Sequence, residues 1–344
     1  MTVYQAGKIA RDQVMQQAGE IPGFDAAFFH GSINELPVNT SFPENSDVDI
    51  IIISEKLKPE FSGKLIRDGL ILDVSRLGRD QVGSAEEILR QYHLAGSFRN
   101  PNIIADISGN LTRVQKEVSR GFAKSYWVRQ RCQHAAERVF RFLKQSDESA
   151  LLPDQVTSWL FAKGVLTHIL LVAGLRNPTV RKRYLAVNKL LSEYHLSDFY
   201  EILLGSLGCT RIDRSQVENQ LQALTRIFDV TQSLKKTQQP FAGDISDAGR
   251  IISIEGSQHL IGSGYHREAV FWIIATYSRC MNILYHDAPD IYQHHLVDYY
   301  QMLNPLGIFS SEDLRFANEE SRKILPRVME IAELIIRGNR DIRD

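Results

Sequence analysis

The chain has 344 residues, of which 43% are hydrophobic and 24% are charged, a composition typical of soluble globular proteins and long enough for two domains. Its formal net charge of −1 excludes a general electrostatic attraction to nucleic acids. No disulfide framework is expected, because the cysteines are odd in number and far apart (Cys132, Cys209 and Cys280). Together with an N-terminus unlike a signal peptide and apolar runs too short for a bilayer, this predicts a cytoplasmic protein.

Helical and strand-like patterns alternate over the first 110 residues. The expected elements are a helix over 5–18, strands over 26–30, 47–53 and 69–75, a helix that begins at the S-x-x-E capping box of Ser84 and Glu87, and a strand over 101–108. This alternation predicts a small mixed β-sheet with helices packed on it.

After residue 110 the pattern changes to helical spacing almost throughout. Glycine and proline signals divide this part into successive amphipathic or buried helices, and the segment with His286, His294 and His295 is expected to be a polar loop between two of them. The predicted fold class is therefore α+β. A domain over residues 1–110 holds the mixed sheet with its flanking helices, and a larger all-helical domain covers residues 111–344.

Two aspartates begin the strand expected over 47–53. Asp47 and Asp49 lie on the same side of it, and the four isoleucines that follow indicate a strand buried on both faces. Two carboxylates this close repel each other unless a cation lies between them. The expected cation is Mg²⁺, which takes oxygen ligands and is commonly bound by one or two carboxylates together with substrate phosphates. A pair of such ions is a common device for displacement at phosphorus.

The Gly31–Ser32 turn and a third acid would complete such a site. Glycine lets the backbone approach a ligand closely, backbone N–H groups in a turn bind anions, and the Ser32 hydroxyl can donate to a phosphate oxygen. The third acid is expected to be Asp73, because it lies among apolar residues on a strand that can pair beside the first acidic strand. Asp106 is the alternative, although it lies next to a turn, where aspartate is common.

The order HGS, SDVDIII and LILDVS, within residues 26–75, resembles the signature of the DNA polymerase β-like nucleotidyltransferase superfamily. The layout is similar to its aminoglycoside and lincosamide nucleotidyltransferase branch. The resemblance implies transfer of a nucleoside monophosphate from an NTP, with ATP expected first, to a hydroxyl of a small-molecule acceptor. Two Mg²⁺ ions, replaceable by Mn²⁺, would assist, and pyrophosphate would leave.

The resemblance also implies roles for single residues. Asp47 and Asp49 would bind both metals, Asp73 would bind the catalytic one, and Gly31 and Ser32 would hold the triphosphate. One departure is the spacer between Ser32 and Asp47, which is longer than in compact members of the family. This longer polar loop leaves the geometry of the phosphate loop open.

The helical domain offers candidates for the remaining roles. Three cations interleaved with aromatic residues are the candidates for binding the triphosphate: Lys124, Arg129 and Arg131. A helix with an aromatic core face and solvated charges explains the same pattern. The resemblance further implies a glutamate of this domain as the general base. Glu255 and Glu268 are the candidates, and no motif chooses between them.

The predicted function is thus that of a small-molecule nucleotidyltransferase. An RNA- or protein-directed nucleotidyltransferase is the first alternative, which the near-neutral charge and the large helical domain disfavour. A catalytically inactive nucleotide-binding regulator is the second, which the intact acids disfavour. No membrane or nucleic-acid partner is expected, a homodimer is left open, and the resemblance does not identify the acceptor.

Overall fold

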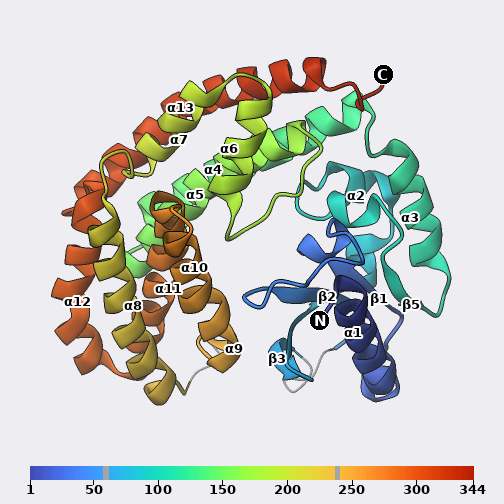
Figure 1. Cartoon of the computed structure of the whole chain (residues 1–344), viewed down its shortest axis with the longest axis horizontal. Coiled ribbons are helices and arrows are strands. Elements are labelled where there is room, and N and C mark those ends of the chain that lie inside the picture. Colours follow the sequence, from blue (N-terminus) through green and yellow to red (C-terminus); the bar gives the residue numbers. More distant parts are fainter. Residues whose placement is uncertain (57–61, 237–240) are drawn as a thin grey trace. The chain divides into compact units, whose positions relative to one another are not determined.

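The computed structural model describes residues 1–56, 62–236 and 241–344 (Figure 1). These residues form two compact units. We call the first the N-terminal unit, and it comprises residues 1–134, 175–177 and 336–344. The second, the helical unit, comprises residues 135–174 and 178–335. The N-terminal unit therefore continues past residue 110, where the sequence pattern changes.

A five-stranded mixed β-sheet forms the core of the N-terminal unit. Its strands are, in spatial order, β3 (Gly63–Arg67), β4 (Leu70–Leu77), β2 (Asp47–Ile53), β1 (Ala26–His30) and β5 (Ile103–Asp106). β2 and β4 are parallel, and the other neighbouring strands are antiparallel. The α+β class is confirmed at this level, with a small mixed sheet followed by a larger helical region. The edge strand β3 was not among the strands that the sequence predicted.

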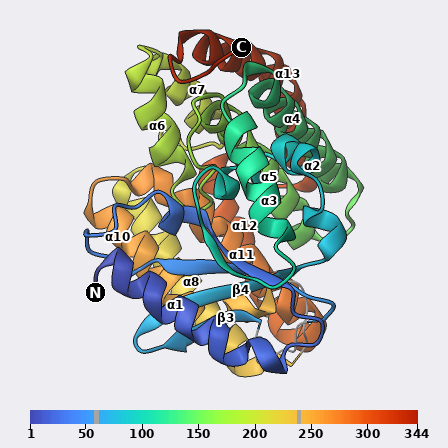
Figure 2. The ribbon, with the colours of Figure 1, turned by 90° about the vertical axis from the view of Figure 1, so that its right-hand side faces the viewer.

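The isoleucine run of β2 is buried on both faces of the sheet, as predicted. Ile50 and Ile52 belong to the same core cluster as the apolar stripe of α1 (Val3–Gln17), which lies along the sheet (Figure 2). Ile51 and Ile53 point to the other face and are also buried. Such burial anchors the strand whose first residues are the two aspartates.

Three further helices complete the N-terminal unit around the sheet. They are α2 (Ala85–Arg90), α3 (Asn110–Gly121) and the first part of α4 (Ser125–Glu148). The Ser84 hydroxyl accepts from the backbone N–H of Glu87, so α2 begins where the capping signal predicted. α3 packs against both α2 and β5. These contacts explain why the compact unit does not end at residue 110.

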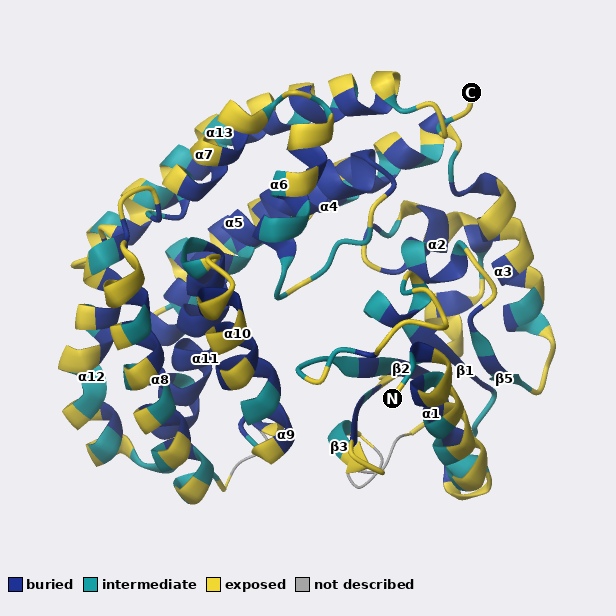
Figure 3. Cartoon of the chain, in the orientation of Figure 1, coloured by how far each residue is buried: buried dark blue, intermediate teal, exposed yellow. Residues whose placement is uncertain are grey.

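The helical unit is built around α5 (Leu152–Ala173) and α11 (His266–Asp287), which are mostly buried (Figure 3). α11 packs against α5 and α8. The other helices with residues in this unit are α4, α6 (Arg183–Glu193), α7 (Ser197–Ser206), α8 (Arg214–Leu234), α9 (Asp247–Arg250), α10 (Gly256–Gly262), α12 (Pro289–Leu303) and α13 (Ser311–Gly338).

The polar loop predicted around the three histidines is wrong. Only Ala288 separates α11 from α12: Pro289 is the first residue of α12, and His294 and His295 lie on that helix. Proline is favoured at a first helical position because its missing N–H would have no partner there. Two buried tyrosines, Tyr292 and Tyr299, form part of its core face.

By length and composition, α5 could cross a membrane, and it is the one such helix among the described residues. The sequence analysis considered only short apolar runs and did not foresee it. Within the structure, 89% of its apolar window is buried. This burial is what a core helix surrounded by other helices shows.

Lys163 of α5 lies in the interior of the helical unit. Its side chain is 1% exposed, and Nζ donates to the backbone oxygen of Ala317 at 3.0 Å. Burial lowers the pKa of Lys163 to about 7, although the nearby Glu320 carboxylate opposes this effect. In the folded protein the ammonium therefore releases its proton far below the pH at which it does so in the unfolded chain.

We predict that Lys163→Met stabilises the protein at and below pH 7 and that this gain shrinks as the pH rises towards 10.5. Below pH 7 Lys163 is protonated in both the folded and the unfolded protein, so the cost of burying its ammonium is fully present. Above pH 7 the unfolded state alone holds the proton, so the stability of the wild type rises with pH. Urea unfolding at several pH values measures the difference. The exposed Lys144→Met is the control, and a gain independent of pH would contradict the prediction.

Candidate metal centre

The parallel pairing of β2 with β4 brings three acids together. Asp49 lies opposite Asp73 in the strand register, and Asp47 lies two residues before Asp49 on the same face. One carboxylate oxygen from each of the three lies within 4.8 Å of the others, so the cluster could hold a metal ion. No other group of His, Cys, Asp or Glu side chains within the described residues has such spacing.

Asp49 is partly buried, as are the other two acids. Burial raises the pKa of its carboxyl group well above the usual range, and the neighbouring charges of Asp47 and Asp73 raise that pKa further. The ammonium of Lys64 acts in the opposite direction. Three ionised carboxylates at this distance are unfavourable without a cation, and either an ammonium or a metal ion relieves the repulsion.

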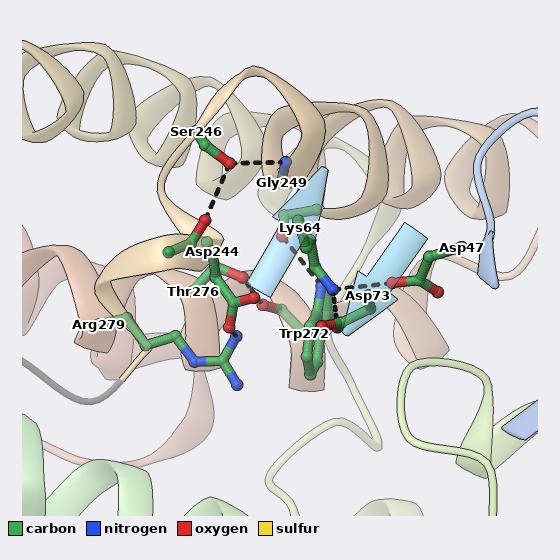
Figure 4. Close-up of polar contacts among 11 residues, drawn as sticks. Asp47, Lys64, Asp73, Asp244, Ser246, Gly249, Trp272, Thr276 and Arg279 are labelled. Atoms are coloured by element: carbon green, nitrogen blue, oxygen red, sulfur yellow. Dashed lines mark hydrogen bonds and ion pairs between the residues drawn. The ribbon is translucent and has the colours of Figure 1, made fainter. Parts of the chain in front are cut away.

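Lys64 supplies such a positive charge from β3. Its Nζ donates to Asp47 Oδ2 at 2.8 Å and also to Asp73 Oδ2 (Figure 4). Lys64 lies opposite Asp73 in the register of the antiparallel β3–β4 pair. Lys64 was not among the site residues expected from the sequence. The available signal was the Asp68–Gly69 dipeptide between two apolar runs, which is typical of a two-residue hairpin turn and would have placed Lys64 across from Asp73.

Gly31 makes room for the Asp49 carboxylate. It follows β1, whose last residue, His30, lies opposite Asp49 in the register. Gly31 has a φ of +66°, and a Cβ at this position would overlap the Asp49 Oδ2 atom. Glycine is therefore required both by the left-handed backbone and by the close approach of the carboxylate. The sequence analysis had assigned the glycine to phosphate approach alone.

The segment around the turn is held by buried polar groups. The side-chain amides of Asn34 and Asn102 donate to the Phe29 oxygen at 2.9 and 2.8 Å. His30 Nδ1 lies 2.5 Å from the Ser97 hydroxyl oxygen, and desolvation lowers the pKa of His30 to about 4. The imidazole is therefore neutral at neutral pH.

Ser32 lies in the 3₁₀ turn Gly31–Asn34 next to the acids and is partly exposed. The backbone of Ser32 accepts from the Glu35 N–H at 3.1 Å, which closes the turn. It directly follows Gly31, whose backbone lies against the Asp49 carboxylate. The residues of the predicted phosphate turn are thus brought to the same place as the acids.

Asp106 has a different role from the other three acids. Its Oδ2 accepts from both the backbone N–H and the hydroxyl of Thr112, each at 2.7 Å. This contact satisfies one backbone N–H in the first turn of α3. Since Asp73 lies in the cluster and Asp106 does not, the structure favours Asp73 as the third acid.

The three cations predicted to bind the triphosphate lie in different surroundings. Lys124 and Arg129 are exposed. Arg131 is 1% exposed, donates to the Phe122 oxygen at 2.6 Å and lies over the Phe122 ring at 4.4 Å from the centroid. Its guanidinium therefore holds the interior of the N-terminal unit together, a role that does not fit phosphate binding.

The two candidate general bases belong to the helical unit and lie outside the cluster of acids. Glu255 is exposed at the end of the π-helical turn Ile251–Glu255. Glu268 is buried and accepts from the Tyr200 hydroxyl at 2.5 Å. Burial and this hydrogen bond raise the pKa of Tyr200. Figure 4 also draws a polar cluster of this unit, in which Arg279 pairs with Asp244 at 2.9 Å.

The chain matches no protein-family model, and no curated protein is significantly similar to it. The reaction is therefore indicated by the residues of the site and by the sequence motif. In this site, three acids, one lysine and a glycine turn lie together at one end of β2.

We predict that Gly31→Ala is more harmful than Gly69→Ala. Both glycines have positive φ, so each alanine costs about 1–2 kcal/mol in backbone strain. A Cβ at Gly69 meets open space, whereas at Gly31 it displaces the Asp49 carboxylate, which should cost roughly a further 1–3 kcal/mol. Denaturant unfolding measures the stability difference, and titration with Mn²⁺ should show affinity reduced about tenfold or more for Gly31→Ala alone. Equal effects at the two positions would contradict the assignment.

Proposed function

We propose that the protein is a nucleotidyltransferase that moves a nucleoside monophosphate from an NTP to a hydroxyl group of a small molecule and releases pyrophosphate. The observation that carries the proposal is the cluster of Asp47, Asp49 and Asp73 beside the Gly31 turn. The resemblance of the same residues to the polymerase β-like signature supports it. ATP is the donor that we expect first.

The donor atoms of the cluster suit Mg²⁺. All three ligands are carboxylates, which are hard oxygen donors, and the cluster contains no thiolate or imidazole that would favour zinc. Asp47 and Asp49 would be shared between two ions, and Asp73 would hold one of them. When bound, the ions activate the acceptor hydroxyl and neutralise the charge that develops on the phosphates.

The other groups of the chain would position the reactants. Backbone N–H groups of the Gly31 turn and the Ser32 hydroxyl would bind the triphosphate. In the transfer step the acceptor oxygen forms a bond to the α-phosphorus, the bond to the β-phosphate oxygen breaks, and pyrophosphate leaves. The acceptor proton passes to a base, for which Glu255 and Glu268 remain the candidates.

A small molecule is the acceptor that the chain favours. The formal net charge of −1 gives no general attraction to RNA, and the helical unit, rather than a basic domain, accompanies the sheet. The described cysteines are buried and form no disulfide, which agrees with a reducing cytoplasm where ATP and Mg²⁺ are supplied.

A nucleotide-binding regulator without catalysis is the second candidate. The contact of Lys64 with two of the acids favours it, because a tethered ammonium already neutralises part of the cluster. Such a protein would bind nucleotide but would not release pyrophosphate. The assay below separates the two functions.

We predict that the protein, given Mg²⁺, each NTP and a panel of hydroxylated small molecules, releases pyrophosphate and labels one acceptor class. Asp47→Asn should lower this activity by at least about a hundredfold, since even the loss of a group that supports a metal ligand costs 10–100-fold. The matched control is Asp106→Asn, which changes an acid on the same sheet but outside the cluster.

Two results would contradict the catalytic proposal. One is nucleotide binding without pyrophosphate release for any acceptor in the panel, which would favour the regulator. The other is equal activity of Asp47→Asn and Asp106→Asn, which would remove the cluster from the chemistry.

A further inference from the structure

The ammonium of Lys64 is almost completely enclosed by the acids of the candidate metal centre and the surrounding protein. The Lys64 side chain is 8% exposed, compared with 20% for Asp47 and 26% for Asp73. Burying an ammonium is costly unless it is paired. Lys64 Nζ donates to two acids of the cluster, and those acids stabilise the buried charge.

A lysine on an edge strand has a more ordinary explanation. Edge strands often carry lysines that keep other chains from pairing with them, but such lysines point into solvent. Lys64 does not, because it points across the pair towards Asp73 and reaches beyond it to Asp47. Arg67, at the other end of β3, is exposed and fits the ordinary explanation.

Lys64 contacts one carboxylate oxygen of Asp47 and one of Asp73, two of the three acids that could hold a metal ion. A metal ion between these two acids would compete with the ammonium, because both are positive and both bind the same carboxylates. In this competition, the fraction of molecules with the ammonium withdrawn limits the apparent metal affinity.

We propose that Lys64 is a tethered counter-cation that offsets part of the negative charge of Asp47 and Asp73 when no metal is bound, and that a metal ion must displace its ammonium to bind between them. The inference rests on the metal-binding part of the proposed function. It assigns to Lys64 control of metal affinity: the lysine lowers the repulsion in the site without an ion, and the site admits an ion only when that ion competes successfully with the lysine.

The test is titration of the full-length protein with Mn²⁺ alone, followed by calorimetry or by the electron paramagnetic resonance signal of free Mn²⁺. Lys64→Met removes the charge and keeps an unbranched apolar stem. If the ammonium occupies the acids in about nine of ten molecules, Lys64→Met should bind Mn²⁺ about tenfold more tightly. Lys64→Arg, which keeps the charge, should show no such gain.

Lys8→Met is the control for net charge. Lys8 is an exposed lysine of the same unit whose Nζ pairs with Asp12 at 2.8 Å. Its removal changes the total charge by the same amount and should leave Mn²⁺ affinity unchanged. An equal gain in Lys8→Met and Lys64→Met would reduce the effect to general electrostatics and would overturn the proposal.

A second measurement uses the wild-type protein and does not depend on the folding of a variant. An amine-reactive reagent with peptide mass spectrometry reports how fast each lysine is modified. Saturating Mn²⁺ should speed modification of Lys64 severalfold and leave that of Lys8 unchanged. A Lys64 amine that stays protected while Mn²⁺ is bound would overturn the proposal.

The outcomes distinguish this inference from the proposed function. If the wild type binds Mn²⁺ through Asp47 but Lys64→Met binds it no more tightly, Lys64 does not compete and only the inference fails. If neither the wild type nor Lys64→Met binds Mn²⁺, the inference and the metal-assisted function fail together.

Discussion

Mutual repulsion among three carboxylates is the constraint on which the rest of the site depends. The parallel register of β2 and β4 holds Asp47, Asp49 and Asp73 together, and the isoleucine run buried on both faces of β2 keeps that register from slipping. Gly31 leaves space for one carboxylate, and the ammonium of Lys64 offsets part of the charge of the other two. Without a cation, ionised carboxylates packed this closely destabilise the folded state.

The local pattern of apolar and turn residues was sufficient to predict the strands that carry the acids. The strands over 26–30 and 47–53 agree with β1 and β2 end to end, because apolar runs bounded by turn residues have little choice of conformation. Asp73 was also expected from the sequence to be the third acid, because the strand that carries it could pair beside β2. That inference needed only neighbouring strands and the two-residue repeat of side chains.

Features that depend on distant residues were not predicted from the sequence. Lys64 gained its meaning from the β3–β4 hairpin, and its charge alone suggested a solvated residue. Arg131 lies on a helix with exposed charges, but its backbone acceptors, Leu89 and Phe122, come from outside that helix. A helix break does fall at Pro289, since α11 ends at Asp287, but the sequence did not show that the next helix begins at that proline and not after a polar loop.

The central claim is that the acids of β2 and β4 form a divalent-cation centre from which Lys64 withdraws. X-ray diffraction from crystals soaked in Mn²⁺, recorded where manganese scatters anomalously, tests it most directly. The account predicts anomalous density bridging the carboxylates of Asp47, Asp49 and Asp73, with the Lys64 ammonium moved away from Asp47 and Asp73. Manganese bound elsewhere, with the cluster empty and Lys64 still joined to both acids, would contradict it.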